Sequence, residues 1–132
     1  PVNRFVADFI GRANFLPVTV EANVGNLWRV RLFATSLQAP AADQQLAAGS
    51  QAILLARPES VRLHPSPPSG PSIPGIVRHT AYLGAQAEYE IEAGGMLIAA
   101  IHHDPGEQDL YPKDSTVYLE FLEKNLFILP NV

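Results

Sequence analysis

Short runs in which apolar and polar residues alternate constrain the fold of this chain most strongly. The segments 16–22, LPVTVEA, and 28–32, WRVRL, both show the alternation, and the glycine and asparagines of 23–26 separate them. Successive side chains of a β-strand point to opposite faces of the sheet, so a period of two predicts strands with one buried and one wet face. These two segments therefore predict a β-hairpin.

Comparable runs recur to the end of the chain. Further strands are predicted over 53–56, 75–84, 85–93, 96–101, 115–123 and 125–129. Glycine and proline lie between them, which is typical of a small barrel or sandwich. The predicted fold class is therefore all-β. Asn3 is a good N-cap, and it predicts one short amphipathic helix over about residues 4–10.

A proline-rich segment divides the strands into two groups. Residues 64–75, HPSPPSGPSIPG, contain five of the twelve prolines, so we expect a connector without a regular strand or helix. The flanking halves, 14–63 and 76–132, are each about 60 residues long, and a unit of that size buries little surface alone. We therefore predict a single domain over 1–132, built of two sub-barrels that share a core.

The composition excludes several classes of protein. The net charge of −4 gives no basic footprint for nucleic acid, and the absence of cysteine excludes disulfides and thiolate metal sites. No apolar run approaches the length of about 20 residues that crosses a bilayer. The chain begins at Pro1 without a methionine, so we expect it to be a piece of a longer protein.

The segment 101–109, IHHDPGEQD, has the residue types of a metal site. Imidazoles and carboxylates bind zinc or iron. However, His102 and His103 would point to opposite faces if a strand continued through them, and the following DPG is a turn sequence. We expect a solvated hairpin loop with no metal, and a metal site is the alternative.

Other chemical candidates have structural explanations. Glu88, Glu90 and Glu92 are spaced for the wet face of one strand, and Trp28 shares a face with apolar residues, which favours core packing over a stacking platform for a base or sugar. The sequence has no G-x-x-x-x-G-K-[ST] phosphate loop, so we expect no catalytic residues and no binding of ATP phosphates here.

Three stretches together resemble one family. NRFVADFIGRANFLP (3–17) resembles the junction that follows the ATPase domain of an ABC importer subunit, and LLARPESVRL (54–63) carries an Arg-Pro-Glu signature at Arg57, Pro58 and Glu59. GIVRHTAYLGAQAEYEIE (75–92) resembles the start of the second half of the C-terminal domain. The order and spacing match the TOBE (transport-associated OB-type) domain of importers for maltose, spermidine/putrescine and iron(III). One departure is Lys113-Asp114-Ser115, where the family often has a Gly-Asp turn.

The resemblance implies a fold and a role. It implies OB-fold-like barrels, two intertwined sub-barrels with exchanged strands, and a junction helix over 1–12. It also implies a non-catalytic regulatory and dimerisation domain of the ATP-binding subunit of an importer for iron(III) or a polyamine. This piece would then need no cofactor, because ATP and Mg bind in the ATPase domain of the parent chain.

The implied partners are a second copy of the chain, the ATPase domain and the membrane subunits, with no nucleic acid. The piece would be soluble, and its parent would be peripheral on the cytoplasmic face of the inner membrane. The unbroken apolar run Leu126, Phe127, Ile128 and Leu129 needs cover on both faces, so it is a possible dimer contact. The alternative function is a free-standing OB-type module for an oligosaccharide or oligonucleotide, which the acidic charge and the few aromatic residues disfavour.

Overall fold

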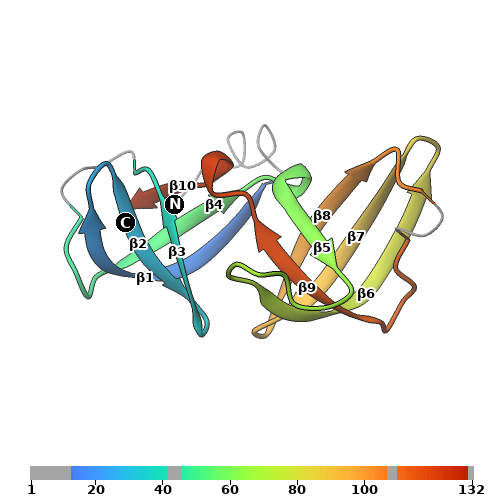
Figure 1. Ribbon diagram of the computed structural model, residues 1–132, viewed down its shortest axis with the longest axis horizontal. Helices are drawn as coiled ribbons and strands as arrows, with labels where there is room; N and C mark the ends of the chain where they lie inside the picture. Colours follow the sequence, from blue (N-terminus) through green and yellow to red (C-terminus); the bar gives the residue numbers. More distant parts are fainter. Residues whose placement is uncertain (1–12, 42–45, 107–109, 131–132) are drawn as a thin grey trace. The chain divides into compact units, whose positions relative to one another are not determined.

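A computed structural model describes residues 13–41, 46–106 and 110–130, and these form an all-β protein with two five-stranded antiparallel sheets (Figure 1). The all-β prediction is confirmed. The predicted helix over 4–10 and the junction segment 1–12 lie outside the described residues. Within the described ranges the only helices are two short 3-10 turns, neither long nor apolar enough to span a membrane.

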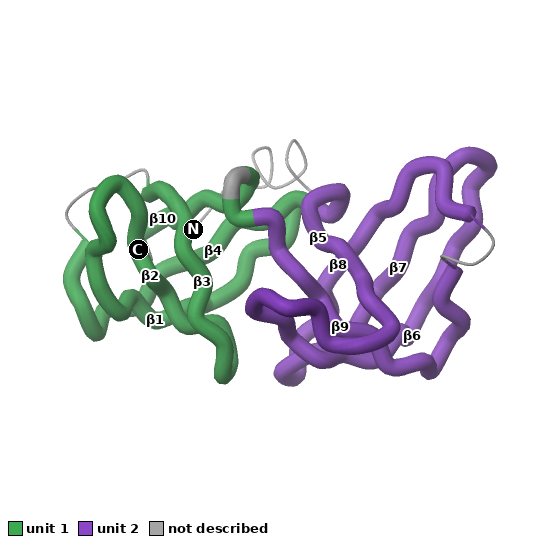
Figure 2. Tube along the Cα trace, viewed as in Figure 1, with its two compact units in different colours: residues 1–57, 123–132 green, residues 58–122 purple. Residues whose placement is uncertain are grey.

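The chain divides into two compact units, of which unit 1 contains residues up to 57 and from 123 onward (Figure 2). Its strands are β1 (Asn14–Val24), β2 (Leu27–Leu32), β3 (Thr35–Ala39), β4 (Gln51–Ala56) and β10 (Phe127–Pro130), and η3 (Glu123–Asn125) precedes β10. The sheet order is β10-β4-β1-β2-β3. Although β10 comes from the end of the chain, it therefore completes the sheet of the first strands.

The sheet of unit 1 closes on itself by backbone pairing. Ala41, just after β3, forms a parallel bridge with Ile128 of β10, and the Ile128 N–H donates to the Pro40 carbonyl at 2.9 Å. The two edge strands of the sheet are thus joined, which makes a small barrel. The inward residues of β1 and β2 are the predicted apolar ones, and Trp28 is buried in this core as expected.

Unit 2 contains residues 58–122. Its elements are η1 (Pro58–Ser60), β5 (Val61–His64), β6 (Ile73–Leu83), β7 (Gln86–Ala93), β8 (Met96–His103) and β9 (Thr116–Phe121). The sheet order is β5-β9-β6-β7-β8, so β5 and β8 are its two edge strands. Alternate residues of β7 are buried, and the intervening glutamates Glu88, Glu90 and Glu92 are half-buried or exposed, as the alternation predicted.

Strand β6 begins inside the predicted proline-rich connector. It starts at Ile73, and Pro74 and Gly75 are part of it, so the expectation of an irregular segment over all of 64–75 is wrong. At Pro74 the strand is paired only with β9, because the pairing with β7 begins at Ile76. The missing N–H of proline is therefore not needed there.

The turn before β9 contains Lys113-Asp114-Ser115, where the family that the chain resembles often has a Gly-Asp turn. The structure shows how the turn forms without that glycine. Asp114 has a φ of 73°, in the left-handed region, and its N–H donates to the Val77 carbonyl at 2.7 Å. Aspartate is among the few non-glycine residues that adopt this conformation readily. Its carboxylate also lies 3.3 Å from Arg78, which ties the turn to β6.

Candidate functional site

The two histidines of the segment 101–109 end strand β8 and do not lie in a loop, so the prediction of a solvated loop is wrong for them. The pairing with β7 continues through His102 and His103, which extends the strand beyond the predicted end at Ile101. His102 is half-buried and His103 is exposed, as expected for neighbours on one strand. In the described ranges, no three His, Asp or Glu side chains group so as to hold a metal ion.

The edge of β5 that faces β8 is not paired with another strand in the described sheet. The Leu122 N–H donates to the Ser60 carbonyl at 3.2 Å, which makes Ser60 and Leu122 a hydrogen-bonded pair of the β5–β9 ladder. Hydrogen-bonded and non-hydrogen-bonded pairs alternate along an antiparallel ladder. The backbone groups of Val61 and Leu63 therefore point away from β9.

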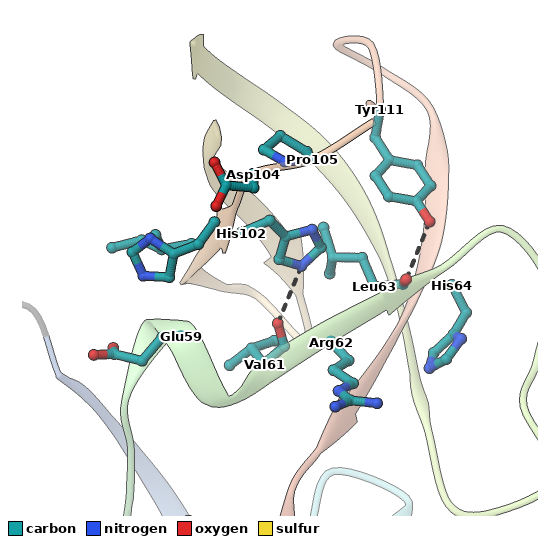
Figure 3. Close-up of a pocket in the computed structure, with 11 residues that line it drawn as sticks. Glu59, Val61, Arg62, Leu63, His64, His102, Asp104, Pro105 and Tyr111 are labelled. Atoms are coloured by element: carbon teal, nitrogen blue, oxygen red, sulfur yellow. Dashed lines mark hydrogen bonds between the residues drawn. The ribbon is translucent and has the colours of Figure 1, made fainter. Parts of the chain in front are cut away.

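Two side chains satisfy the carbonyls on this edge. The His102 Nε2 donates to the Val61 carbonyl at 3.4 Å, and the Tyr111 hydroxyl donates to the Leu63 carbonyl at 3.0 Å (Figure 3). The sheet of unit 1 is closed by backbone pairing between its edge strands. In unit 2 the side chains of His102, on edge strand β8, and of Tyr111, in the segment after β8, bond to the other edge strand, β5. We call the space between β5 and β8 the seam.

An aromatic cluster supports the two bridging side chains. The buried Tyr89 ring makes edge contacts with His102, at 5.7 Å between ring centroids, and with Tyr111, at 6.1 Å. The Tyr111 N–H also donates to the Tyr89 hydroxyl at 3.3 Å. Tyr89 on β7 thus positions both side chains, which come from segments on either side of the residues 107–109.

A pocket of about 570 Å³ opens at the seam, and we call it the seam pocket. Glu59 and residues 61–64 line it from η1 and β5, and residues 101–105 and Tyr111 line it from β8 and the segment that follows (Figure 3). Its volume is in the range of small-molecule sites. Of the residues that the sequence singled out, it brings together Glu59, His102, His103 and Asp104. It adds Arg62, which follows the Arg-Pro-Glu signature, and His64 and Tyr111, which no local motif marks.

The Arg-Pro-Glu signature lies where β4 passes into η1. Pro58 is buried and opens the 3-10 turn, as expected for a proline at the first helical position, whereas Arg57 and Glu59 are exposed. The apolar run at the chain end is partly used within unit 1. Leu126 and Ile128 are buried in its core, and Phe127 and Leu129 are half-buried.

Away from the seam, an ion-pair network lies on the outer face of the sheet of unit 1. Glu21 accepts hydrogen bonds from Ser36 at 2.7 Å, from Arg31 at 2.8 Å and from Arg29 at 3.2 Å. The Ser36 hydroxyl and the Arg31 guanidinium lower the pKa of Glu21, with a smaller contribution from Arg29. This network links β1, β2 and β3 on their wet face.

Residues 54–129 match the model of the TOBE domain family. The chain is 33% identical over 131 residues to the Fe(3+) ions import ATP-binding protein FbpC of Brucella abortus (strain 2308), which covers 98% of this chain and 35% of that protein. It is also 33% identical over 123 residues to the spermidine/putrescine import ATP-binding protein PotA of Ruegeria pomeroyi, covering 92% of this chain and 32% of that protein. The chain thus spans about a third of the length of these relatives.

A solved structure shares the fold. The cytoplasmic molybdate-binding protein ModG, crystallised with molybdate bound, superposes with a TM-score of 0.71 over 87% of this chain and 94% of that one. The sequence identity is 20%, so the likeness concerns the arrangement of the strands alone.

Proposed function

This chain belongs to the TOBE domain family, and on that premise we propose that it is the C-terminal regulatory and dimerisation domain of the ATP-binding subunit of an ABC-type importer. The observation that carries the proposal is the similarity to FbpC and PotA over nearly the whole chain, within about a third of each relative. The missing phosphate loop supports it, because ATP hydrolysis would then belong to another part of the parent chain. The solute would be iron(III) or a polyamine, as in the names of these relatives.

The proposed role has a simple physical basis. A domain that dimerises away from the ATPase domains keeps two of them at a high effective concentration after ATP hydrolysis separates them. A regulator that prefers one dimer arrangement then shifts the ATPase cycle by its difference in affinity for the two states. The parent would be peripheral on the cytoplasmic face of the inner membrane, bound to the membrane subunits.

Fractionation of cells that carry the native gene tests the proposal. An antibody raised against this chain should detect a polypeptide about three times as long, in the membrane fraction and with integral membrane proteins after mild detergent extraction. Deletion of the gene should abolish uptake of either radiolabelled iron(III) or spermidine, which also identifies the solute. A polypeptide of about the present size in the soluble fraction, with both uptakes intact, would support a free-standing binding module instead.

A further inference from the structure

Charged side chains without a partner gather at the seam pocket. Elsewhere in the described ranges most charges are paired, as in the contacts of Glu21 with Arg29 and Arg31. Among the described aspartate, glutamate, arginine and lysine side chains, those with neither an ion pair nor a side-chain hydrogen bond are Arg57, Glu59, Arg62, Asp104 and Lys113. Three of these five line the seam pocket, namely Glu59, Arg62 and Asp104.

Arg62 is unpaired although an acidic residue lies directly opposite. In the β5–β9 register Arg62 faces Glu120, a position where opposite charges usually pair. A carboxylate oxygen of Glu120 instead lies 2.8 Å from Nε2 of His64, which is two residues after Arg62 on β5. Arg62 is therefore a lining residue of the seam pocket whose guanidinium has no side-chain partner in the described ranges.

The backbone adds a donor of the same kind. The N–H group of Leu63 faces the seam along with its carbonyl, and no hydrogen-bond acceptor in the described ranges is assigned to it. The N–H of Val61 follows the 3-10 turn of η1 and bonds back to it. The Leu63 N–H and the Arg62 guanidinium can both donate to a carboxylate, and arginine does so with two parallel hydrogen bonds. This side of the seam pocket thus suits a carboxylate.

Glu59 and Asp104 carry negative charge, so their carboxylates suit an ammonium group. In Figure 3, Glu59 lies at the lower left beside η1 and Asp104 lies above it, and the Arg62 side chain extends below β5 to their right. Leu63, Ile101, Pro105 and Tyr111 supply apolar surface to the lining. A phosphate or a polyanion would meet two carboxylates for one guanidinium, so the charges disfavour it.

We propose that the seam pocket binds a small zwitterionic molecule of the amino-acid class, with its ammonium group at Glu59 and Asp104 and its carboxylate at Arg62. Such a ligand would lie across the seam between β5 and β8. It would therefore stabilise the side-chain closure that His102 and Tyr111 make. This inference goes beyond the importer assignment. The two are tested independently, because ligand binding is measured on the present chain and the importer assignment by fractionation and uptake in cells.

Calorimetric titration with ω-amino acids of increasing length tests the proposal. The probes are glycine, 4-aminobutyrate and 6-aminohexanoate, with butylamine and butyrate as controls that carry one charge each. At least one zwitterion should bind with a Kd below about 1 mM, and both one-charge controls should bind at least about tenfold more weakly. Absence of binding for all three zwitterions up to about 20 mM, or equal binding of a one-charge control, would overturn the proposal.

Substitutions locate the site. Glu59→Gln, Asp104→Asn and Arg62→Gln should each raise the Kd of the best zwitterion about tenfold or more, and asparagine keeps the left-handed conformation of Asp104, whose φ is 49°. Arg57→Gln and Lys113→Gln remove unpaired charges outside the seam pocket and should leave the Kd within about twofold. Amide NMR shifts induced by the ligand should centre on β5 and the end of β8. Shifts confined to unit 1, or unchanged affinity in all three pocket variants, would place the ligand elsewhere and refute the site.

Discussion

Gly75 is a single position where the packing of unit 2 leaves no space for a side chain. A Cβ atom there would lie 2.6 Å from Cγ2 of Ile91 and 3.0 Å from the Glu92 carbonyl oxygen. Ile91 is fully buried, so neither neighbour can move away cheaply. Gly75→Ala should lower the free energy of unfolding of unit 2 by about 1–3 kcal/mol, as overpacked cores do, in urea unfolding followed by tyrosine near-UV circular dichroism.

Gly70→Ala is the matched control. Nothing lies within 4 Å of a Cβ atom at Gly70, so this variant should unfold within about 0.5 kcal/mol of the unmodified chain. Equal stability of the two variants would show that β6 and β7 can move apart at Gly75 without lowering the free energy of unfolding of unit 2.

The two adjacent histidines should differ in their contribution to stability. His102 is half-buried, bonds to the Val61 carbonyl and contacts the Tyr89 ring, whereas His103 is exposed. His102→Ala should therefore lower the free energy of unfolding by about 1 kcal/mol, and His103→Ala by less than about 0.5 kcal/mol. Thermal unfolding of both variants gives the comparison, and a larger effect of His103→Ala would contradict the strand assignment at the end of β8.

Glu21 should give the stability of unit 1 a pH dependence. Its pKa is lowered in the folded chain by Ser36 and Arg31, so the folded chain binds the proton less readily than the unfolded chain. The resulting stabilisation is complete above the unfolded pKa of about 4.3 and is lost as the pH falls through the lowered folded pKa. Glu21→Gln should therefore flatten the fall in stability of unit 1 between about pH 5 and pH 3.

Trp28 fluorescence reports on this transition, because Trp28 is buried in the same unit. Glu59→Gln provides a control, since Glu59 is exposed and has no ion pair in the described ranges. An unchanged slope for Glu21→Gln would mean that folding does not lower the pKa of Glu21.

At the scale of elements, β10 is the strand on which the closure of unit 1 depends. It pairs with β4 along four residues and bridges Ala41 through Ile128, which is fully buried. Ile128→Ala should lower the free energy of unfolding of unit 1 by about 2–5 kcal/mol, the usual range for a buried isoleucine. Leu129→Ala, at the neighbouring half-buried position, should cost clearly less.

The same substitution distinguishes the two units. Unit 2 contains no residue of β10, so its amide NMR spectrum should be retained in Ile128→Ala when the signals of unit 1 are lost at moderate urea concentration. Simultaneous loss of both sets of signals would show that the units unfold together.

The strands that sequence alone predicted are those with a clear alternation. Segments such as 16–22 and 85–93 showed their buried faces because every second residue is apolar. Strands β3 and β5 were not predicted, since five and four residues are too few to establish a period, and β3 is largely polar. The proline-rich beginning of β6 was not predicted, because proline is normally excluded from the interior of a sheet. Proline is tolerated where a strand is paired on one side only, as β6 is at Pro74.

The seam pocket could be predicted only in part. The Arg-Pro-Glu signature and the two histidines drew attention to Glu59 and His102, but not to each other. Tyr111 contacts Leu63 across 48 positions of the sequence, and His102 contacts Val61 across 41. Such contacts follow from which strands become the edges of the sheet, and no local pattern encodes that choice.

At the scale of the whole molecule, we predict a two-fold homodimer that uses the outward side of β10. Phe127 and Leu129 remain half-buried, while Ile128 points into the core of unit 1. A stable interface buries about 1,200–2,000 Å² in total, and a two-fold contact uses the same patch on both copies. Two large apolar side chains on one strand would supply the centre of such a patch.

Light scattering after size exclusion at about 100 µM should give twice the 14.3 kDa mass of the chain, and the double variant Phe127→Ser, Leu129→Ser should return it toward a single chain. Leu97→Ser is the control, because Leu97 is a large apolar residue of unit 2 that is 55% exposed, and its loss should leave the dimer intact. Because Phe127 and Leu129 are not core residues, the double variant should keep its circular dichroism spectrum. A single-chain mass at every concentration would exclude the dimer. If the double variant still forms a dimer, the contact does not lie on β10. The half-buried state of Phe127 and Leu129 would then reflect the packing of unit 1 alone.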